Sequence, residues 1–173
     1  LGDVYKRQLQ TFVALAVSSI AGYGFEIYHD KAKDTVMSIL MLAMMVPFVA
    51  VLVPLFQMFT KAKLLNSWTG FILPSIATPF LIMYFRNSAR SFPRDTLEAA
   101  RIDGLNEFQI FIRMFIPMMK PTYASAATIT FMGAWNAYLW PKVIMQTNEA
   151  ITMPMLVANT MGGYVIDYGV VMA

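Results

Sequence analysis

Apolar residues gather into four long runs that contain no charged residue. The runs are residues 8–25, 35–60, 64–85 and 121–141. A helix rises 1.5 Å per residue, so about 20 apolar residues cross the roughly 30 Å of hydrocarbon in a bilayer. The pattern therefore predicts four membrane-spanning helices, near residues 9–28, 36–59, 66–86 and 119–140. The first run is the shortest and reaches this length only if residues 26–28 lie at the membrane interface.

Four prolines fall inside the predicted spans: Pro47, Pro54, Pro74 and Pro79. A membrane bundle tolerates such prolines as kinks, because neighbouring helices satisfy the carbonyls that proline leaves free. Pro47 and Pro54 are seven residues apart, which predicts that they share one face of the 36–59 helix. Simple kinking is the commoner reason for such prolines, and a bent helix that lines a pathway is the alternative.

Composition excludes several classes of protein. Hydrophobic residues make up 58% and charged residues 13% of the chain, whereas a soluble domain carries about 25% charged residues. This excludes a disordered chain, a coiled coil and a typical water-soluble enzyme. The chain has no cysteine and a single histidine, His29, so we expect neither disulfides nor a metal centre built on thiolates or imidazoles.

Basic residues divide unequally between the loops on the two sides of the predicted bundle. Loops 29–35 and 86–120 hold eight, and loops 60–65 and 141–168 hold three. The eight are Lys31, Lys33, Arg86, Arg90, Arg94, Arg101, Arg113 and Lys120. Because basic loops stay in the cytoplasm, the pattern places 86–120 on the cytoplasmic side. The same bias accounts for the net charge of +3 better than nucleic-acid binding does.

Motifs for chemistry on a substrate are missing. The sequence has no Gly-x4-Gly-Lys-[Ser/Thr] phosphate loop, no His-Glu-x-x-His and no Gly-x-Ser-x-Gly, so we expect no ATPase, metalloprotease or hydrolase activity. Among ionisable residues only Glu26 approaches a span, near its end. Proton-coupled carriers usually place such groups near mid-membrane. The pattern favours a pathway for a neutral substrate, powered by another subunit and using no cofactor.

The cytoplasmic loop predicts a helix that begins near Pro93 and stops at Gly104. Proline is tolerated in a first helical turn, Asp95 complements the helix dipole there, and glycine permits a left-handed stop. Glu98 and Arg101 are three residues apart on this helix and can pair, for a gain of only about 0.2–0.5 kcal/mol. Ala99 and Ala100 form a patch of small residues that would let another protein approach closely.

A second helix is predicted from Asn106, with Asn106 and Gln109 placed as a capping box. Phe108, Ile112 and Phe115 follow at helical spacing, with Phe111 beside them. The loop 91–117 is therefore expected to form a helix–turn–helix that stands off the membrane, as a mechanical contact with a partner requires.

These residues carry a family resemblance. Glu98-Ala99-Ala100, then Gly104 after three intervening residues and Met114-Phe115-Ile116-Pro117 after nine more, resemble the pattern Glu-Ala-Ala-x3-Gly-x9-Ile-x-Leu-Pro of binding-protein-dependent ABC importer permeases. Met114 and Ile116 replace the Ile and Leu of the pattern, and both changes preserve apolar character and volume. Further similarities to the carbohydrate branch of these permeases lie at 45–47, 54–55, 64–66, 72–74, 135–136, 139–141 and 167–169.

The resemblance implies an all-α polytopic transmembrane bundle of the type seen in maltose-type second permease subunits. That family normally has six spans, so residues 9–173 would supply four complete spans and the start of another, with a cytoplasmic coupling loop at 87–118. Residues 1–8 resemble a non-native leader and are expected to lie outside this partial domain.

The resemblance also implies a role for the loop. Its coupling helix would dock on an ABC ATP-binding subunit, with Glu98 pairing to the ATPase, Ala99 and Ala100 permitting a close fit, and Asp103 and Gly104 at the turn. Further implied partners are a second permease subunit, an extracellular solute-binding protein, a sugar or oligosaccharide, and the lipid of a bacterial inner membrane. The alternatives are a permease of the same architecture for a polyamine or phosphate ester, or a multi-span structural or channel protein outside the ABC class.

Overall fold

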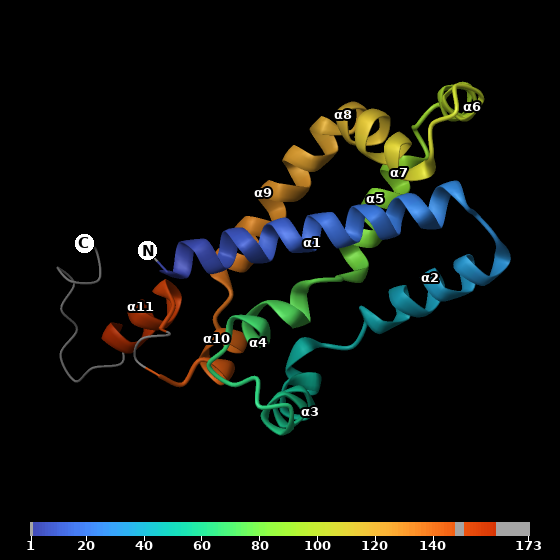
Figure 1. The fold of residues 1–173 in the computed structure, drawn as a ribbon. Helices are drawn as coiled ribbons and strands as arrows, with labels where there is room; N and C mark the ends of the chain where they lie inside the picture. The colour runs from blue at the N-terminus through green and yellow to red at the C-terminus, as the bar shows by residue number, and fades with distance from the viewer. Residues whose placement is uncertain (1, 148–150, 162–173) are drawn as a thin grey trace. The chain divides into compact units, whose positions relative to one another are not determined.

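The computed structural model describes residues 2–147 and 151–161, and every regular element in these ranges is helical (Figure 1). The longer helices are α1 (Gly2–Ile27), α2 (Lys31–Ala43), α3 (Phe48–Lys61), α5 (Pro79–Ala89), α6 (Arg94–Ile102), α9 (Lys120–Asn136) and α11 (Met153–Met161). Short helices connect them: α4 (Trp68–Ile72), η1 (Leu73–Ser75), α7 (Glu107–Ile110), η2 (Phe111–Phe115), α8 (Ile116–Met118) and α10 (Leu139–Ile144). The predicted all-α class is confirmed.

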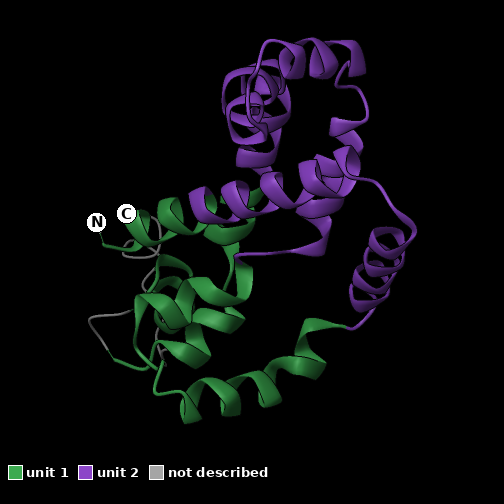
Figure 2. Cartoon of the chain, turned by 45° about the vertical axis from the view of Figure 1, so that its right-hand side comes forward, with its two compact units in different colours: residues 1–11, 47–75, 130–173 green, residues 12–46, 76–129 purple. Residues whose placement is uncertain are grey.

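The chain divides into two compact units, which Figure 2 colours separately. Unit 1 comprises residues 1–11, 47–75 and 130–173, and unit 2 comprises residues 12–46 and 76–129. The cytoplasmic loop predicted at 87–118 lies wholly within unit 2. Each unit is described by itself below.

Helices occupy all four of the predicted apolar runs, but three of these runs are interrupted: the run at 121–141 passes from α9 to α10 at residues 137–138, and the two others divide nearer their middle. The run at 36–59 is divided between α2 and α3, which residues 44–47 separate. Pro47 is the cause, because it has no N–H to give to a continuing helix and sits extended (φ −65°, ψ 136°) before α3. Of Pro47 and Pro54, only Pro54 lies inside a helix. The prediction that the two prolines share one helix face is therefore wrong.

The run at 66–86 is divided between α4 with η1 and α5, which residues 76–78 separate. Pro79 opens α5 in its first turn, where the missing N–H costs nothing. By length and hydropathy, no single helix among the described residues meets the requirement for crossing a membrane, whereas each of the two bent pairs meets it together.

Unit 1 contains a group of three helices, α3 and the short α4 and α10, packed around Trp140; we call it the tryptophan group. The indole ring lies edge-on to Phe59, with centroids 5.1 Å apart, and its Nε1–H donates to the carbonyl of Gly70 at 3.1 Å. Asn66, in a left-handed conformation (φ 53°), accepts the backbone N–H groups of Gln146 at 2.6 Å and Thr147 at 3.3 Å. These bonds join segments that are far apart in the sequence.

Unit 2 packs α1 closely against α5. A Cβ at Gly22 would lie 2.6 Å from Cβ of Phe85 and 2.7 Å from the backbone nitrogen of Arg86, so only glycine allows the two helices to approach this closely. Leu81 and Phe85 of α5 are buried here together with Ala14 of α1 and Ala126 of α9. The helix that leads into the cytoplasmic loop is thus fixed to α1 before the loop begins.

Candidate functional site

The first helix of the loop, α6, begins directly after Pro93. Pro93 is extended (φ −64°, ψ 124°) and is the N-cap residue that precedes the helix. The sequence instead places this proline inside the first helical turn. Asp95 lies in the first turn as predicted, where a carboxylate complements the positive end of the helix dipole.

The stop at Gly104 is confirmed in detail. Gly104 has φ +80°, which a residue with a side chain rarely adopts. Its N–H donates to the carbonyl of Arg101 at 3.1 Å, and the N–H of Leu105 donates to the carbonyl of Ala100 at 3.1 Å. This pair of bonds is a Schellman motif, which satisfies the last carbonyls of α6 and turns the chain sharply.

The predicted capping box of the second helix is present. The side chain of Asn106 accepts the backbone N–H of Gln109 at 2.9 Å, and the side chain of Gln109 accepts the backbone N–H of Asn106 at 3.0 Å. The helix continues from α7 through a single π-helical turn, η2, and through α8. The helix–turn–helix is therefore closed by hydrogen bonds at the end of its first helix and at the start of its second.

The structure divides the predicted site residues between two faces of α6. Glu98, Ala99, Asp103 and Gly104 are exposed to solvent. Ala100 is 2% exposed and is buried with Leu97 against the core of the loop. The prediction that Ala100 forms part of the contact patch is wrong, because its small side chain lets α6 sit close to its own core. Ala99 alone offers a small residue to a partner.

The predicted pair between Glu98 and Arg101 is replaced by another ion pair. Arg101 Nε donates to Glu107 Oε1 at 2.8 Å, which links α6 to α7 across the turn. Burial favours a raised pKa for Glu107, but the hydrogen bonds from Arg101 and from neighbouring tyrosines outweigh it, so the pKa of this carboxyl is lowered. Glu107 is therefore ionised at neutral pH, and Glu98 on the outer face is left for another contact.

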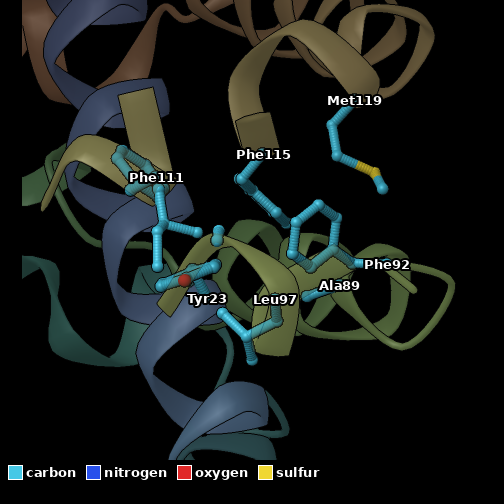
Figure 3. Close-up of a cluster of buried hydrophobic side chains, with 9 residues drawn as sticks. Tyr23, Ala89, Phe92, Leu97, Phe111, Phe115 and Met119 are labelled. Atoms are coloured by element: carbon cyan, nitrogen blue, oxygen red, sulfur yellow. The ribbon is translucent and has the colours of Figure 1, made fainter. Parts of the chain in front are cut away.

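A core of aromatic residues supports the two helices (Figure 3). Ile110, Phe111 and Phe115 are buried there, together with Phe92, Leu97 and Tyr23 of α1. The stripe expected at Phe108, Ile112 and Phe115 is only partly correct: Phe115 is buried, but Phe108 is 71% and Ile112 43% exposed. The buried face instead follows Phe111 and Phe115, whose rings stack at 5.5 Å across the π-helical turn.

Two exposed apolar residues flank the turn and were not among the predicted site residues. Ile102, the last residue of α6, is 85% exposed, and Phe108 of α7 is 71% exposed. Together they offer apolar surface beside the turn that another protein could cover. The sequence does hold a signal for Ile102: on a helix that ends before Gly104, Ile102 lies away from the face that buries Leu97 and Ala100. That signal can be used only once the end of the helix is known.

An arginine cluster joins three helices where the loop leaves α5. Arg86 is 5% exposed, and it contacts Glu26 of α1 at 3.3 Å and Asp34 of α2 at 2.5 Å. Arg90 contacts the same Glu26 oxygen at 3.4 Å. The hydrogen bond from Arg86 lowers the pKa of Asp34, with help from His29 at 2.9 Å. In the sequence, Arg86 and Arg90 signal only membrane orientation, because their acidic partners lie more than 50 positions away.

The described residues bring together no group of three or more His, Cys, Asp or Glu that could hold a metal ion. What unit 2 presents instead is an exposed helix end, with a carboxylate, a small residue and two apolar side chains, held by a buried core and by ion pairs. This arrangement can bind another protein and transmit a displacement from it.

Comparison with known proteins identifies related chains. A family model described as "Binding-protein-dependent transport system inner membrane component" matches residues 14–173. The lactose transport system permease protein of Rhizobium radiobacter is 43% identical over 162 residues, which cover 94% of this chain and 59% of that protein. The arabinooligosaccharides transport system permease protein of Bacillus subtilis (strain 168) is 35% identical over 91% of this chain and 56% of its own length.

A solved structure shares the fold. It is a crystal structure of a bacterial ABC transporter involved in the import of the acidic polysaccharide alginate, and the match has a TM-score of 0.81 at 23% identity. It covers 97% of this chain and 61% of the chain in that structure. The present chain spans somewhat under two thirds of the length of the relatives it matches.

Proposed function

This chain belongs to the family of binding-protein-dependent transport system inner membrane components, and we propose that it acts as a permease subunit of an ATP-driven ABC importer for a sugar or oligosaccharide. Hydrolysis of ATP is then the task of separate subunits, in keeping with the missing phosphate loop. The names of two matched relatives specify transport of lactose and of arabinooligosaccharides, which supports a carbohydrate substrate.

The observation that carries the proposal is the exposed end of α6. Glu98 and Ala99 point outward on a helix whose end is fixed by the Schellman motif at Gly104. Ile102 and Phe108 add large apolar side chains on either side of the turn. Interfaces commonly have such an apolar centre with a charged rim. We assign the docking contact with the ATP-binding subunit to Glu98, Ala99, Ile102, Asp103 and Phe108, with Gly104 setting the shape of the turn.

The charge distribution supports the orientation that docking needs. Eight basic residues lie in the loops at 29–35 and 86–120, against three on the other side. The positive-inside rule then puts the coupling segment, residues 91–117, in the cytoplasm, where ATP-binding subunits are. In this arrangement the chain is a multi-pass protein of the bacterial inner membrane. It pairs with a second permease subunit and receives its sugar from a solute-binding protein on the outer side.

The test uses the complete reading frame that contains this chain, produced with its ATP-binding subunits, second permease and binding protein. Uptake of radiolabelled lactose, arabinooligosaccharide, polyamine and glycerol phosphate is measured in cells. Carbohydrate uptake that depends on the chain supports the proposal, whereas uptake of only the polyamine or the phosphate ester would assign a different substrate. If the ATP-binding subunits do not co-purify with the chain, the docking role proposed for residues 91–117 is wrong.

The role of the turn is tested by Gly104→Val. A β-branched residue at φ +80° is strained and would distort the turn, so we expect loss of ATPase binding and of uptake. Gly133→Ala is the matched control, because a Cβ at Gly133 meets nothing within 4 Å and alanine favours the helix there. Wild-type uptake by Gly104→Val would contradict a coupling role for this turn.

A further inference from the structure

A second connection joins the coupling segment to α1, through residues that the family pattern does not include. The loop is covalently continuous with α5 and leads into α9, so both helices are pulled directly when it moves. Helix α1 has no such link. A displacement of the loop reaches α1 through non-covalent contacts alone, either by way of α5, on which α1 packs at Gly22, or directly through side chains of the loop.

Glu107 lies at the centre of these contacts. Its Oε1 accepts Arg101 Nε of α6 at 2.8 Å, and its Oε2 lies 3.5 Å from the hydroxyl of Tyr23 on α1. One carboxylate thus contacts both helices. It is ionised, because hydrogen bonds hold its pKa below the usual value in spite of burial.

The ring of Tyr23 is fixed as firmly as its hydroxyl. Tyr23 is 5% exposed, and its ring lies edge-on to Phe111 at 5.2 Å and to Phe115 at 4.9 Å. Figure 3 shows the tyrosine within the aromatic core beneath the loop. The residue directly before Tyr23 is Gly22, which packs on α5. Tyr23 and Gly22 therefore hold α1 to the loop and to α5 at adjacent positions.

We propose that Glu107 is a positioning residue that makes α1 move together with the coupling segment, by binding Arg101 of α6 and Tyr23 of α1 at once. A push on the exposed end of α6 passes through the Arg101–Glu107 pair and the tyrosine into α1. Loss of the carboxylate leaves the docking face of α6 in place but lets α1 lag behind the loop. This inference rests on the proposed function, since it concerns how that importer transmits motion.

The experiment uses the assembled transporter, from the complete reading frame with its partner subunits, reconstituted in proteoliposomes. Two quantities are measured on the same preparation: ATP hydrolysed, and sugar transported. In Glu107→Gln we expect normal co-purification of the ATP-binding subunits and normal basal ATP hydrolysis. The sugar moved per ATP should fall about fivefold, at the low end of couplings between sites. Tyr23→Phe, which keeps the ring and removes the hydroxyl, should give a smaller fall.

A charge exchange separates positioning from a simple loss of structure. Arg101→Glu combined with Glu107→Arg rebuilds the ion pair in reverse, and it should recover most of the sugar moved per ATP that Glu107→Gln loses. Lys33→Gln is the matched control, because it breaks a comparable exposed pair with Asp30 at 2.7 Å outside the loop; it should leave the ratio unchanged.

Three results would overturn the inference: a wild-type ratio in Glu107→Gln, loss of ATPase co-purification in that variant, or no recovery in the charge exchange. Failure of the proposed function looks different. In that case the wild-type chain itself neither co-purifies with ATP-binding subunits nor supports sugar uptake, before any variant is compared.

Discussion

The coupling segment and the tryptophan group are both built from short helices, but their hydrogen bonds span very different distances along the chain. In the coupling segment, the Schellman motif, the capping box and the Arg101–Glu107 pair each join residues no more than six positions apart. In the tryptophan group, Trp140 bonds to Gly70 and Asn66 to Gln146, which are 70 and 80 positions apart. The first region is specified locally, and the second only when distant segments have met.

The arginine cluster complicates this contrast, because the locally specified segment stands on a long-range base. Arg86 bonds to Glu26 and Asp34, 60 and 52 positions away. A coupling segment that keeps its own shape still needs this base to be held against α1 and α2. The predictions below test how far local shape and long-range attachment can be separated.

The largest effect is expected from Arg86→Gln. Removing one partner of a buried ion pair leaves the other charge poorly compensated and costs about 3–5 kcal/mol. For a chain of this size, about 3 kcal/mol corresponds to a fall in Tm of roughly 6–12 °C, measured by thermal unfolding in detergent. Arg90→Gln is the matched control: Arg90 contacts the same Glu26 oxygen, but its side chain is 59% exposed, so the cost should stay below about 1 kcal/mol. Equal losses in the two variants would contradict a buried role for Arg86.

The next effect concerns Gly22→Ala. The added Cβ would lie 2.7 Å from the backbone nitrogen of Arg86 and 2.9 Å from the carbonyl oxygen of Ile82, and backbone atoms cannot move aside cheaply. Overpacking of this kind costs about 1–3 kcal/mol. Gly24→Ala on the same helix adds a Cβ that meets nothing within 4 Å and should be neutral or stabilising in the same thermal measurement. A loss in Gly24→Ala as large as in Gly22→Ala would show that helix flexibility, and not contact with α5, sets the need for glycine.

Local signals were enough to predict the coupling segment and not enough to predict what lies around it. The stop at Gly104 and the capping box at Asn106 follow from residue type and spacing, so the sequence predicted both. The sequence did not predict that Arg101 pairs with Glu107 and not with Glu98, because this pairing depends on how the turn folds α7 back onto α6. The burial of Ala100 was missed for the same reason: both alanines look alike until the core beneath the helix is known.

The broken run at 35–60 shows the opposite limitation. Hydropathy is high across the whole run, so length alone predicted one helix from 36 to 59. The break before Pro47 arises from backbone chemistry, since proline cannot donate and biases the preceding residue away from the helix. Pro54 has the same chemistry and stays inside α3. Residue type marks both as possible breaks, and only the surrounding structure decides between them.

Two asparagines allow a direct comparison of local and long-range caps. Asn66→Ala removes the acceptor of two backbone N–H groups and a residue suited to positive φ, so we expect a loss of about 1–2 kcal/mol. Asn106→Ala removes an N-cap and should cost about 1 kcal/mol. Hydrogen exchange distinguishes them: Asn66→Ala should speed exchange at Gln146 and Thr147, and Asn106→Ala should speed it only near Gln109. Faster exchange at 146–147 in both variants would contradict separate caps.

The smallest effect is the pH dependence contributed by Asp34. The hydrogen bond from Arg86 lowers its pKa in the folded protein below the reference value of 3.8, so between the folded and unfolded pKa values the unfolded chain binds more protons. The stabilisation from Asp34 is therefore complete above about pH 4 and is lost as pH falls through the folded pKa. Asp34→Asn lacks it, so the variant should unfold a few degrees below wild type at pH 6, and the two should converge as the pH falls through the folded pKa of Asp34. A difference in Tm that stays constant down to pH 3 would mean that Asp34 acts through packing alone, and that the long-range base of the coupling segment depends on Glu26 for its charge.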